Sequence, residues 1–303
     1  MSNDTIKVLF DTDIGSDIDD AVALAYLLAQ PRCDLLGITT VSGQPSERAK
    51  LASAICKTAG ADIPIIPGHE HRLDGPTRQP EVPQTSVLPN WEHDTRFSDQ
   101  GAIDFMAETI RNNPNEVALL AVGPVTNVAR LFNEHPDTAS LLKSLHMMIG
   151  RFSDSRELPV SEWNAHCDPA AADVVYSTAA PSHTSLGLDV THQVVMDSGQ
   201  VKTHFQHPVL KPVYEMSKVW FSARPELKFH DPLAAVTLFD ESVCEYEQGT
   251  ATVKCTDDRD DGETMWSPNA KGPHRVGKTV DAARFFDSYF SVFSQKPRAC
   301  SPG

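Results

Sequence analysis

Short apolar runs alternate with longer segments of helical periodicity through the first two-thirds of the chain. Apolar runs of about 4–8 residues favour strands, whereas apolar positions that recur every three or four residues favour helices. The predicted strands are Ile6–Phe10, Leu35–Val41, Ile63–Ile66, Val117–Val122, Leu145–Ile149 and Ser185–Leu188. The predicted helices are Asp20–Gln30, Ser46–Ala59, Ser98–Asn112, Asp168–Ser177 and the aromatic-rich Asp281–Phe293. This alternation predicts an α/β protein whose mostly parallel central sheet is covered by helices on both faces.

Two segments interrupt the alternation. The first, His69–Asp94, contains four prolines and has no clean periodicity, which predicts a long loop. Loops of this length commonly serve as lids, so we expect residues 69–94 to form an active-site flap. The second, Cys255–His274, is an acidic excursion near the end of the chain. Neither segment has the composition of a linker, and we predict one domain that spans residues 1–303.

The composition is that of an ordinary globular protein, with 40% hydrophobic and 22% charged residues. No apolar run approaches the ~18 residues of a membrane-spanning helix, so we expect no membrane partner. The net charge is −15, from 26 basic and 41 acidic residues, which disfavours a nucleic-acid partner. The six cysteines are scattered without a CxxC pair, and the first residues do not resemble a secretory signal. We therefore expect reduced thiols and a cytoplasmic location.

Five aspartates fall between positions 11 and 20, in the stretch DTDIGSDIDD that joins the first predicted strand to the first predicted helix. Crowded carboxylates raise one another's pKa unless a cation lies among them. Asp11 and Asp13 point to the same side of an extended segment, and Asp19 and Asp20 begin the helix. The pattern therefore favours a divalent-cation site at the carboxyl end of a buried strand, where open α/β sheets bind ligands.

A metal site competes with three alternatives for these aspartates. The simplest is a solvated acidic turn whose last member caps the helix. A calcium loop of the EF-hand kind is excluded, because a loop that begins at Asp11 would need Glu at its twelfth place and has Val22 there. An aspartyl-phosphate type of phosphatase also places D-x-D after its first strand. That alternative stays open, although the usual Gly-Thr does not follow Asp13.

Further polar motifs follow in order along nearly the whole chain. They are GITTVSGQ (Gly37–Gln44), AVGPVTNVA (Ala121–Ala129), EWNAHCDPAAA (Glu162–Ala172), LGLDVTHQV (Leu186–Val194), FHDPLAAV (Phe229–Val236) and VGKTVDAARF (Val276–Phe285). Together with the aspartate-rich opening, they resemble the inosine-uridine-preferring nucleoside hydrolase family, whose members begin with strand-D-x-D-P-G-x-D-D-A-helix. The resemblance implies a single α/β domain with a Rossmann-like central sheet flanked by helices.

The resemblance also implies an activity and a site. The activity is Ca²⁺-dependent hydrolysis of the N-ribosidic bond of ribonucleosides, which gives free base and ribose in nucleoside catabolism, by a homodimer or homotetramer. The implied Ca²⁺ ligands are Asp13, Asp20, the main-chain carbonyl of Val122, and Asp231. The implied substrate contacts are Asp19, Gln44, Glu162 and Asn164. The implied catalytic residues are Asp13, which takes a proton from water, and His230, whose unperturbed pKa of ~6.5 suits protonation of the departing base.

The sequence departs from the family pattern at several positions. An apparent two-residue insertion leaves open whether Asp17 or Asp19 contacts the ribose. Gln44 stands where the family has Asn. The flap lacks the frequent His-Gly-x-x-Gly segment, and we expect its Trp91 to stack on the base instead. A calcium-binding relative that has lost catalysis is therefore an alternative to an active enzyme, and His230 taken alone is compatible with a packed core histidine.

Overall fold

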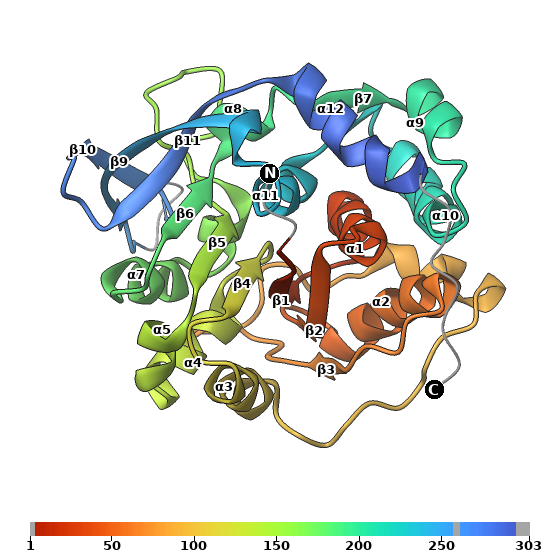
Figure 1. Cartoon of the computed structure of the whole chain (residues 1–303), viewed down its shortest axis with the longest axis horizontal. Helices are drawn as coiled ribbons and strands as arrows, with labels where there is room; N and C mark the ends of the chain where they lie inside the picture. Colours follow the sequence, from red (N-terminus) through yellow and green to blue (C-terminus); the bar gives the residue numbers. More distant parts are fainter. Residues whose placement is uncertain (1–3, 257–260, 295–303) are drawn as a thin grey trace.

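Within residues 4–256 and 261–294, which the computed structural model describes, the centre of the molecule is a sheet of nine strands (Figure 1). The strands are β1 (Ile6–Thr12), β2 (Cys33–Thr40), β3 (Ile65–Pro67), β4 (Val117–Ala121), β5 (Ser144–Met148), β6 (His183–Leu186), β9 (Cys244–Val253), β10 (Thr264–Pro268) and β11 (His274–Val280). Their spatial order is β10-β9-β11-β6-β5-β4-β1-β2-β3. All pairs from β11 to β3 are parallel, whereas β9 pairs antiparallel with β10 and β11.

Helices cover both faces of this sheet (Figure 1). They are α1 (Asp19–Ala29), α2 (Pro45–Ala59), α3 (Ala102–Asn112), α4 (Thr126–Glu134), α5 (Asp137–Leu141), α6 (Trp163–Cys167), α7 (Pro169–Ser177), α8 (Leu188–Thr191), α9 (Ser198–His204), α10 (Leu210–Phe221), α11 (His230–Thr237) and α12 (Ala282–Ser291). Alternate side chains of β1 supply both cores. Val8 and Phe10 pack with α1, α2 and α10 to α12, whereas Leu9 packs with α3, α4 and α7. The predicted α/β fold is confirmed.

The order of the parallel strands creates the place for a ligand. The chain proceeds from β1 to β2 and β3 on one side, and then returns to β4 on the other side of β1. In open α/β sheets, the crevice outside the carboxyl ends of the strands at such a reversal is the usual ligand site. The aspartate-rich segment that follows β1 begins at this reversal.

Aromatic packing fixes the helices that carry the site. Phe285 and Tyr289 of α12 are fully buried, and Tyr289 stacks on Tyr26 of α1 with ring centroids 5.5 Å apart. The Tyr289 hydroxyl donates to the main-chain carbonyl of Val22 at 3.0 Å. Phe229, directly before α11, packs edge-on against both rings of α12. The last helix therefore holds α1 and α11 in a fixed relation.

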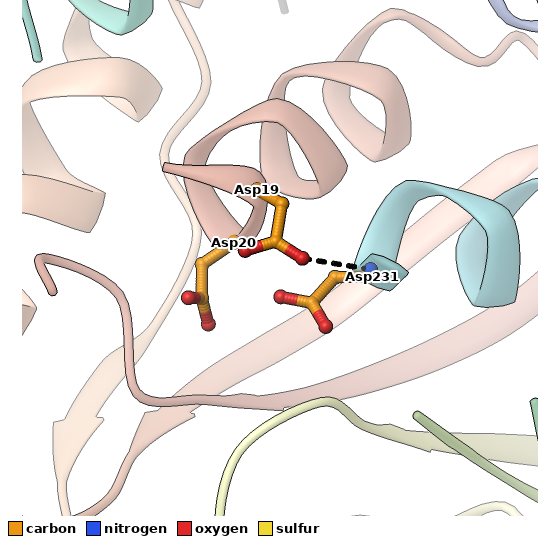
Figure 2. A group of neighbouring side chains, drawn as sticks. All are labelled: Asp19, Asp20 and Asp231. Carbon is orange, nitrogen blue, oxygen red and sulfur yellow. Dashed lines mark hydrogen bonds between the residues drawn. The ribbon is translucent and has the colours of Figure 1, made fainter. Parts of the chain in front are cut away.

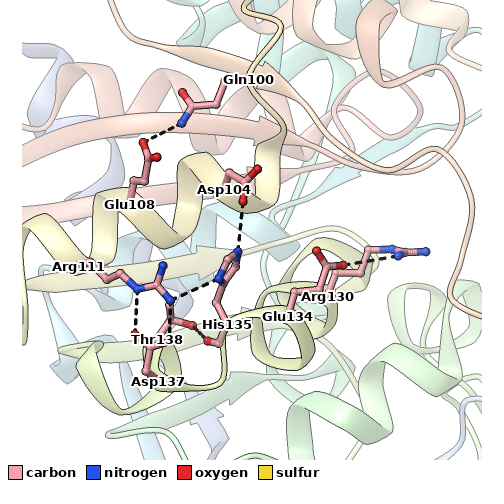
Figure 3. Close-up of polar contacts among 9 residues, drawn as sticks. All are labelled: Gln100, Asp104, Glu108, Arg111, Arg130, Glu134, His135, Asp137 and Thr138. Carbon is pink, nitrogen blue, oxygen red and sulfur yellow. Dashed lines mark hydrogen bonds and ion pairs between the residues drawn. The ribbon is translucent and has the colours of Figure 1, made fainter.

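The helices on the other face of the sheet carry a polar network at their surface (Figure 3). Arg111 of α3 makes two hydrogen bonds to the carboxylate of Asp137 at the start of α5, at 2.7 and 2.9 Å. His135 lies between Arg111 and Asp104, 3.3 Å from each. This network links α3 to α5, but exposed pairs of this kind contribute little stability, because water and salt screen them.

Several details differ from the sequence-based predictions. The flap segment is not irregular throughout, because Pro83–Asn90 form the 3₁₀ helix η1, whose first turn tolerates proline. The acidic excursion contributes the edge strand β10, while its residues 257–260 lie outside the described part of the chain. A separate two-stranded sheet pairs β7 (Val195–Asp197) with β8 (Glu226–Lys228). No helix among the described residues is both long and apolar enough to cross a membrane.

Candidate functional site

A cavity of about 670 Å³ opens at the carboxyl ends of β1 and β4. Its floor is formed by the aspartate-rich segment after β1 and by Val122 after β4. The walls come from α6, α10 and α11 and from flap residues between Arg78 and Pro83. Segments from the beginning, middle and end of the chain therefore meet at the reversal point of the sheet.

Three carboxylates converge at the bottom of this cavity (Figure 2). Asp19 and Asp20 begin α1, and Asp231 lies in the first turn of α11; one oxygen from each lies within 4.8 Å of the others. Each residue is only 3% exposed. The main-chain N–H of Asp231 donates to Asp19 at 3.1 Å, and the hydroxyl of Thr12 donates to Asp20 at 2.5 Å. The two helix N-termini thus aim their partial positive charges at one acidic point.

Burial makes ionisation of all three carboxylates energetically unfavourable. Removal from water raises the pKa of Asp19, Asp20 and Asp231 well above the usual value, and mutual repulsion among the carboxylates adds to it. The donors are all hard oxygen atoms, which suit a hard divalent cation and do not suit a soft metal. These residues therefore fit a metal ion, whose charge would offset the repulsion.

Asp13 lies beside this group at the end of β1. After burial, its charge is the largest cause of the raised pKa of Asp20. One oxygen of Asp13 accepts a hydrogen bond of 2.6 Å from the side-chain amide of Gln79. The other lies against Gly123, where an added Cβ would come within 2.7 Å of it. Glycine in the Gly-Pro turn after β4 is thus what allows Asp13 to occupy this position.

Arg48 supplies a positive charge beneath the aspartates. It is fully buried, and its guanidinium donates to the main-chain carbonyls of Asp13, of Ile14 at 3.1 Å and of Gly43 at 2.8 Å. Burial raises the pKa of Asp13, and the charge of Arg48 is the strongest of the influences that lower it. Sequence analysis missed this residue. Its one indication was that Arg48 occupies the buried stripe of α2, one helical turn before Leu51 and Ala52.

Asp11 does not share the cavity with Asp13. It is fully buried and does not line the cavity; one oxygen accepts from Thr39 at 2.6 Å and from Asn127 at 2.7 Å. Burial raises the pKa of Asp11 to about 7. Asp11 therefore ties β1 to β2 and α4, and its burial argues against the aspartyl-phosphate alternative, which needs an accessible nucleophile after the first strand.

Glu162 and Asn164 are placed on the wall by the short helix α6. Glu162 caps the helix by accepting from the main-chain N–H groups of Asn164 at 2.8 Å and Ala165 at 3.0 Å, and it also accepts from Gly150 at 3.0 Å. Burial nevertheless raises its pKa to about 7. The Asn164 amide donates to the carbonyl of Val122 at 2.7 Å. Both residues line the same cavity as the aspartates.

His230, the first residue of α11, also lines the cavity. Its Nδ1 lies 2.7 Å from the hydroxyl of Thr191, and its ring is 5.3 Å from that of His192. Burial lowers the pKa of His230 to about 3, and the neighbouring His192 adds to the effect. A pKa this low keeps the ring neutral at physiological pH, so the expectation that His230 has a near-neutral pKa suited to protonating the base is wrong for this structure.

Two residues that the sequence assigned to the substrate are not brought to the cavity. Gln44 adopts a left-handed backbone with φ of +57° before α2, and its amide donates to the carbonyl of Pro80 at 2.8 Å. Trp91 is half-buried against the core and does not line the cavity, whereas Trp163 and Trp220 do. The aromatic surface near a substrate thus comes from α6 and α10 in place of the flap.

The alternative between Asp17 and Asp19 is not resolved in favour of one residue. Asp19 belongs to the carboxylate cluster, and Asp17 also lines the cavity. Burial raises the pKa of Asp17 to about 7. Asp17 therefore does not point away from the site, and both carboxylates are available to a ligand.

Comparison with known proteins places this site in a family. The family model described as "Inosine-uridine preferring nucleoside hydrolase" matches residues 8–287. The chain belongs to this family. Among curated nucleoside hydrolases, the pyrimidine-specific ribonucleoside hydrolase RihA of Citrobacter koseri is 32% identical over 62% of this chain and 62% of its own length. Uridine nucleosidase 1 of Arabidopsis thaliana is 28% identical over 82% of this chain and 78% of its own length.

Solved nucleoside hydrolases have the same fold. A purine-preferring ribonucleoside hydrolase from Gardnerella vaginalis superposes with a TM-score of 0.82, at 22% identity, over 95% of this chain and 98% of its own. An inosine-uridine preferring nucleoside hydrolase from Bacillus anthracis gives 0.78, at 20% identity, over 95% and 99%. At these identities the likeness concerns the fold alone. Several curated relatives are matched over less than two-thirds of their length, 62–65%.

The buried carboxylates predict that the metal-free protein loses stability as pH rises. Asp11, Asp17 and Glu162 have pKa values of about 7 when folded, against roughly 4 when unfolded. Their contribution is therefore complete below about pH 4 and is lost as pH rises through about 7. In chelator, the thermal unfolding midpoint should fall between about pH 5.5 and 7.5. Asp11→Asn should make this slope shallower, and a midpoint that rises with pH would contradict the assignment.

Proposed function

We propose that this protein hydrolyses the N-ribosidic bond of ribonucleosides to free base and ribose, with Ca²⁺ as its metal. One observation supports this most directly: residues that the family resemblance assigns to metal and ribose line a single cavity in a chain of the nucleoside hydrolase family. These residues are Asp13, Asp19, Asp20, Val122, Glu162, Asn164 and Asp231. The proposal extends to a cytoplasmic homodimer or homotetramer, in keeping with the resemblance.

The polar wall suits a ribose. Asp19 or Asp17, together with Glu162, offers acceptors for sugar hydroxyls, and Asn164 offers an amide. Cleavage of an N-ribosidic bond passes through a state with positive charge on the sugar, as in glycoside hydrolysis. Carboxylates that already surround the sugar stabilise that charge without reorganisation. The same residues therefore bind the substrate and favour its transition state.

Asp13 is proposed as the base. Water adds to C1′ of the ribose while its proton passes to Asp13, and the C1′–N bond breaks with its electron pair on the departing base. Bound Ca²⁺, held by Asp20, Asp231, the carbonyl of Val122 and Asp13, would lower the pKa of water in the site. Arg48 beneath the loop keeps Asp13 in reach of the cavity floor.

His230 is proposed to assist the departing base as a neutral hydrogen-bond donor. When the Thr191 hydroxyl donates to Nδ1, the single proton of the neutral ring resides on Nε2. That nitrogen can donate to the base as negative charge develops on it. A low pKa is compatible with this function, because the ring does not have to be cationic before the bond breaks.

The flap remains part of the proposal. Arg78, Gln79, Pro80, Glu81 and Pro83 line the cavity, which supports closure of residues 69–94 over a substrate. The alternative is a metal-binding relative without catalysis, favoured by the position of Gln44 away from the cavity.

Purified protein should release ribose from at least one member of a panel of purine and pyrimidine nucleosides. Reducing-sugar assays measure this directly, and the panel also reveals the preferred base. Asp13→Asn should lower turnover by about 10²-fold or more, because proton transfer is lost while shape is retained. Absence of turnover on every member would instead support the non-catalytic relative.

Chelated and dialysed protein should rebind about one Ca²⁺ per chain, as measured by titration calorimetry. Asp20→Asn should weaken this binding by about tenfold or more, because one carboxylate of the cluster is lost. Asp197→Asn, which alters an exposed cap of α9, is the matched control and should bind normally. Full activity in excess chelator, with no metal detected, would refute the metal site.

The effect of His230→Ala should depend on the leaving group. Uridine or inosine hydrolysis should slow by about 10²-fold or more, whereas a p-nitrophenyl riboside, whose leaving group needs no donor, should be barely affected. Thr191→Val should give a weaker loss with the same pattern, since it removes the partner that fixes the tautomer. Equal losses on both substrates would mean that His230 orients the sugar.

A further inference from the structure

We propose that Gln79 of the flap, a residue to which the sequence analysis gave no role, is the positioning residue for Asp13. The inference rests on the proposed hydrolysis, in which Asp13 accepts the proton of the attacking water. Gln79 is 8% exposed and lines the cavity. Its Nε2 donates to Asp13 Oδ2 at 2.6 Å and to the hydroxyl of Ser16 at 3.0 Å. A donor at this distance fixes one carboxylate oxygen and leaves the other for the reaction.

The orientation of the Gln79 amide is set by a third residue. The indole N–H of Trp163 donates to Gln79 Oε1. An indole nitrogen is a donor only, so the amide oxygen must face Trp163 and the amide NH₂ must face Asp13. Trp163 is 53% exposed at the mouth of the cavity. A chain of two hydrogen bonds therefore runs from the rim of the cavity to the proposed base.

The backbone around Gln79 is anchored on both sides. Its main-chain N–H donates to the Thr77 hydroxyl at 3.1 Å, and its carbonyl accepts from Arg48 at 3.3 Å. The preceding residue, Arg78, pairs with the buried Asp261 at 2.6 Å. These contacts hold the tip of the flap against α2 and against the residues before β10. In this conformation, with the flap over the cavity, Gln79 is thus presented to Asp13 from a backbone anchored on both sides, as a positioning role requires.

Gln44 serves the same arrangement from outside the cavity. Its amide donates to the carbonyl of Pro80, the residue after Gln79. The carbonyl of Gly43 receives Arg48, which also contacts Gln79. Gly43 and Gln44, which lie between β2 and α2, therefore support the flap, and the flap supplies the amide that reaches Asp13.

Gln79→Ala should lower kcat because Asp13 is then free to rotate away from the water. Loss of a partner that orients a site residue typically lowers activity by ~10–100-fold. The loss should be equal on uridine and on p-nitrophenyl riboside, because it concerns water addition and is independent of the leaving group. KM should change by less than about threefold, because the ribose contacts remain. Gln79→Glu, which keeps the shape but removes the donor, should lose at least as much.

The assays are run at saturating Ca²⁺, with thermal unfolding recorded for each variant. Gln84→Ala is the matched control: Gln84 is a buried glutamine of the same flap whose amide binds the carbonyls of Ser16 and Asp17, and it does not line the cavity. It should lower the unfolding midpoint while kcat stays within about threefold of wild type. An equal kcat loss in Gln84→Ala would overturn the proposal, since flap stability would then account for both losses.

Other outcomes separate this inference from the proposed function. If the wild type is active and Gln79→Ala has a normal kcat, the positioning role is overturned while the hydrolase proposal stands. The same conclusion follows if Gln79→Ala changes only KM, or if its kcat falls only with uridine. A kcat loss in Gln44→Ala that exceeds the loss in Gln79→Ala would also overturn the positioning role, because support of the flap through Pro80 would then matter more than the amide that contacts Asp13. No wild-type turnover on any substrate overturns the hydrolase proposal and the positioning role with it.

Discussion

Repulsion among four buried carboxylates is the constraint on which the structure of the site depends. Asp13, Asp19, Asp20 and Asp231 are nearly excluded from water and face one another. An isolated buried charge would neutralise itself by a change of pKa. Two helix N-termini, the guanidinium of Arg48 and the hydroxyl of Thr12 each offset part of this repulsion. A divalent cation bound there would offset the remainder and would thereby link metal affinity to fold stability.

The elements that carry these carboxylates are held in place by their neighbours in the fold. β1 is hydrogen-bonded on both sides, and Asp11 further ties it to β2 and α4. The aromatic residues of α12 hold α1 against α11, the two helices that contribute the carboxylates. Fixed geometry matters because each carboxylate has to face the same point within fractions of an ångström. The flap then completes the cavity from the outside.

Much of the fold and part of the site could be predicted from the sequence. Apolar runs located the parallel strands β1 to β6, because buried strands carry little else. β9, β10 and β11 were missed, since partly exposed strands near an edge of the sheet mix polar and apolar residues. Asp231 could be associated with Asp20 only through the family resemblance, because no local pattern links residues so distant in the chain. The orientation of Gln44 depends on a left-handed backbone that a non-glycine residue seldom adopts. Gln79 lay in a segment without periodicity, where pattern analysis has nothing to measure.

The contact between α12 and the helices of the site has a consequence for biosynthesis. A chain emerges from the ribosome with its N-terminus first, and α1 with its two aspartates is complete long before α11 and α12 exist. Until α11 brings Asp231 and α12 brings Tyr289, Asp19 lacks the main-chain donor of Asp231, and Tyr26 lacks the ring that stacks on it. The nascent chain therefore carries an unfinished half-site through most of translation. The cavity therefore reaches its final form only after α12 has been synthesised and has packed against α1.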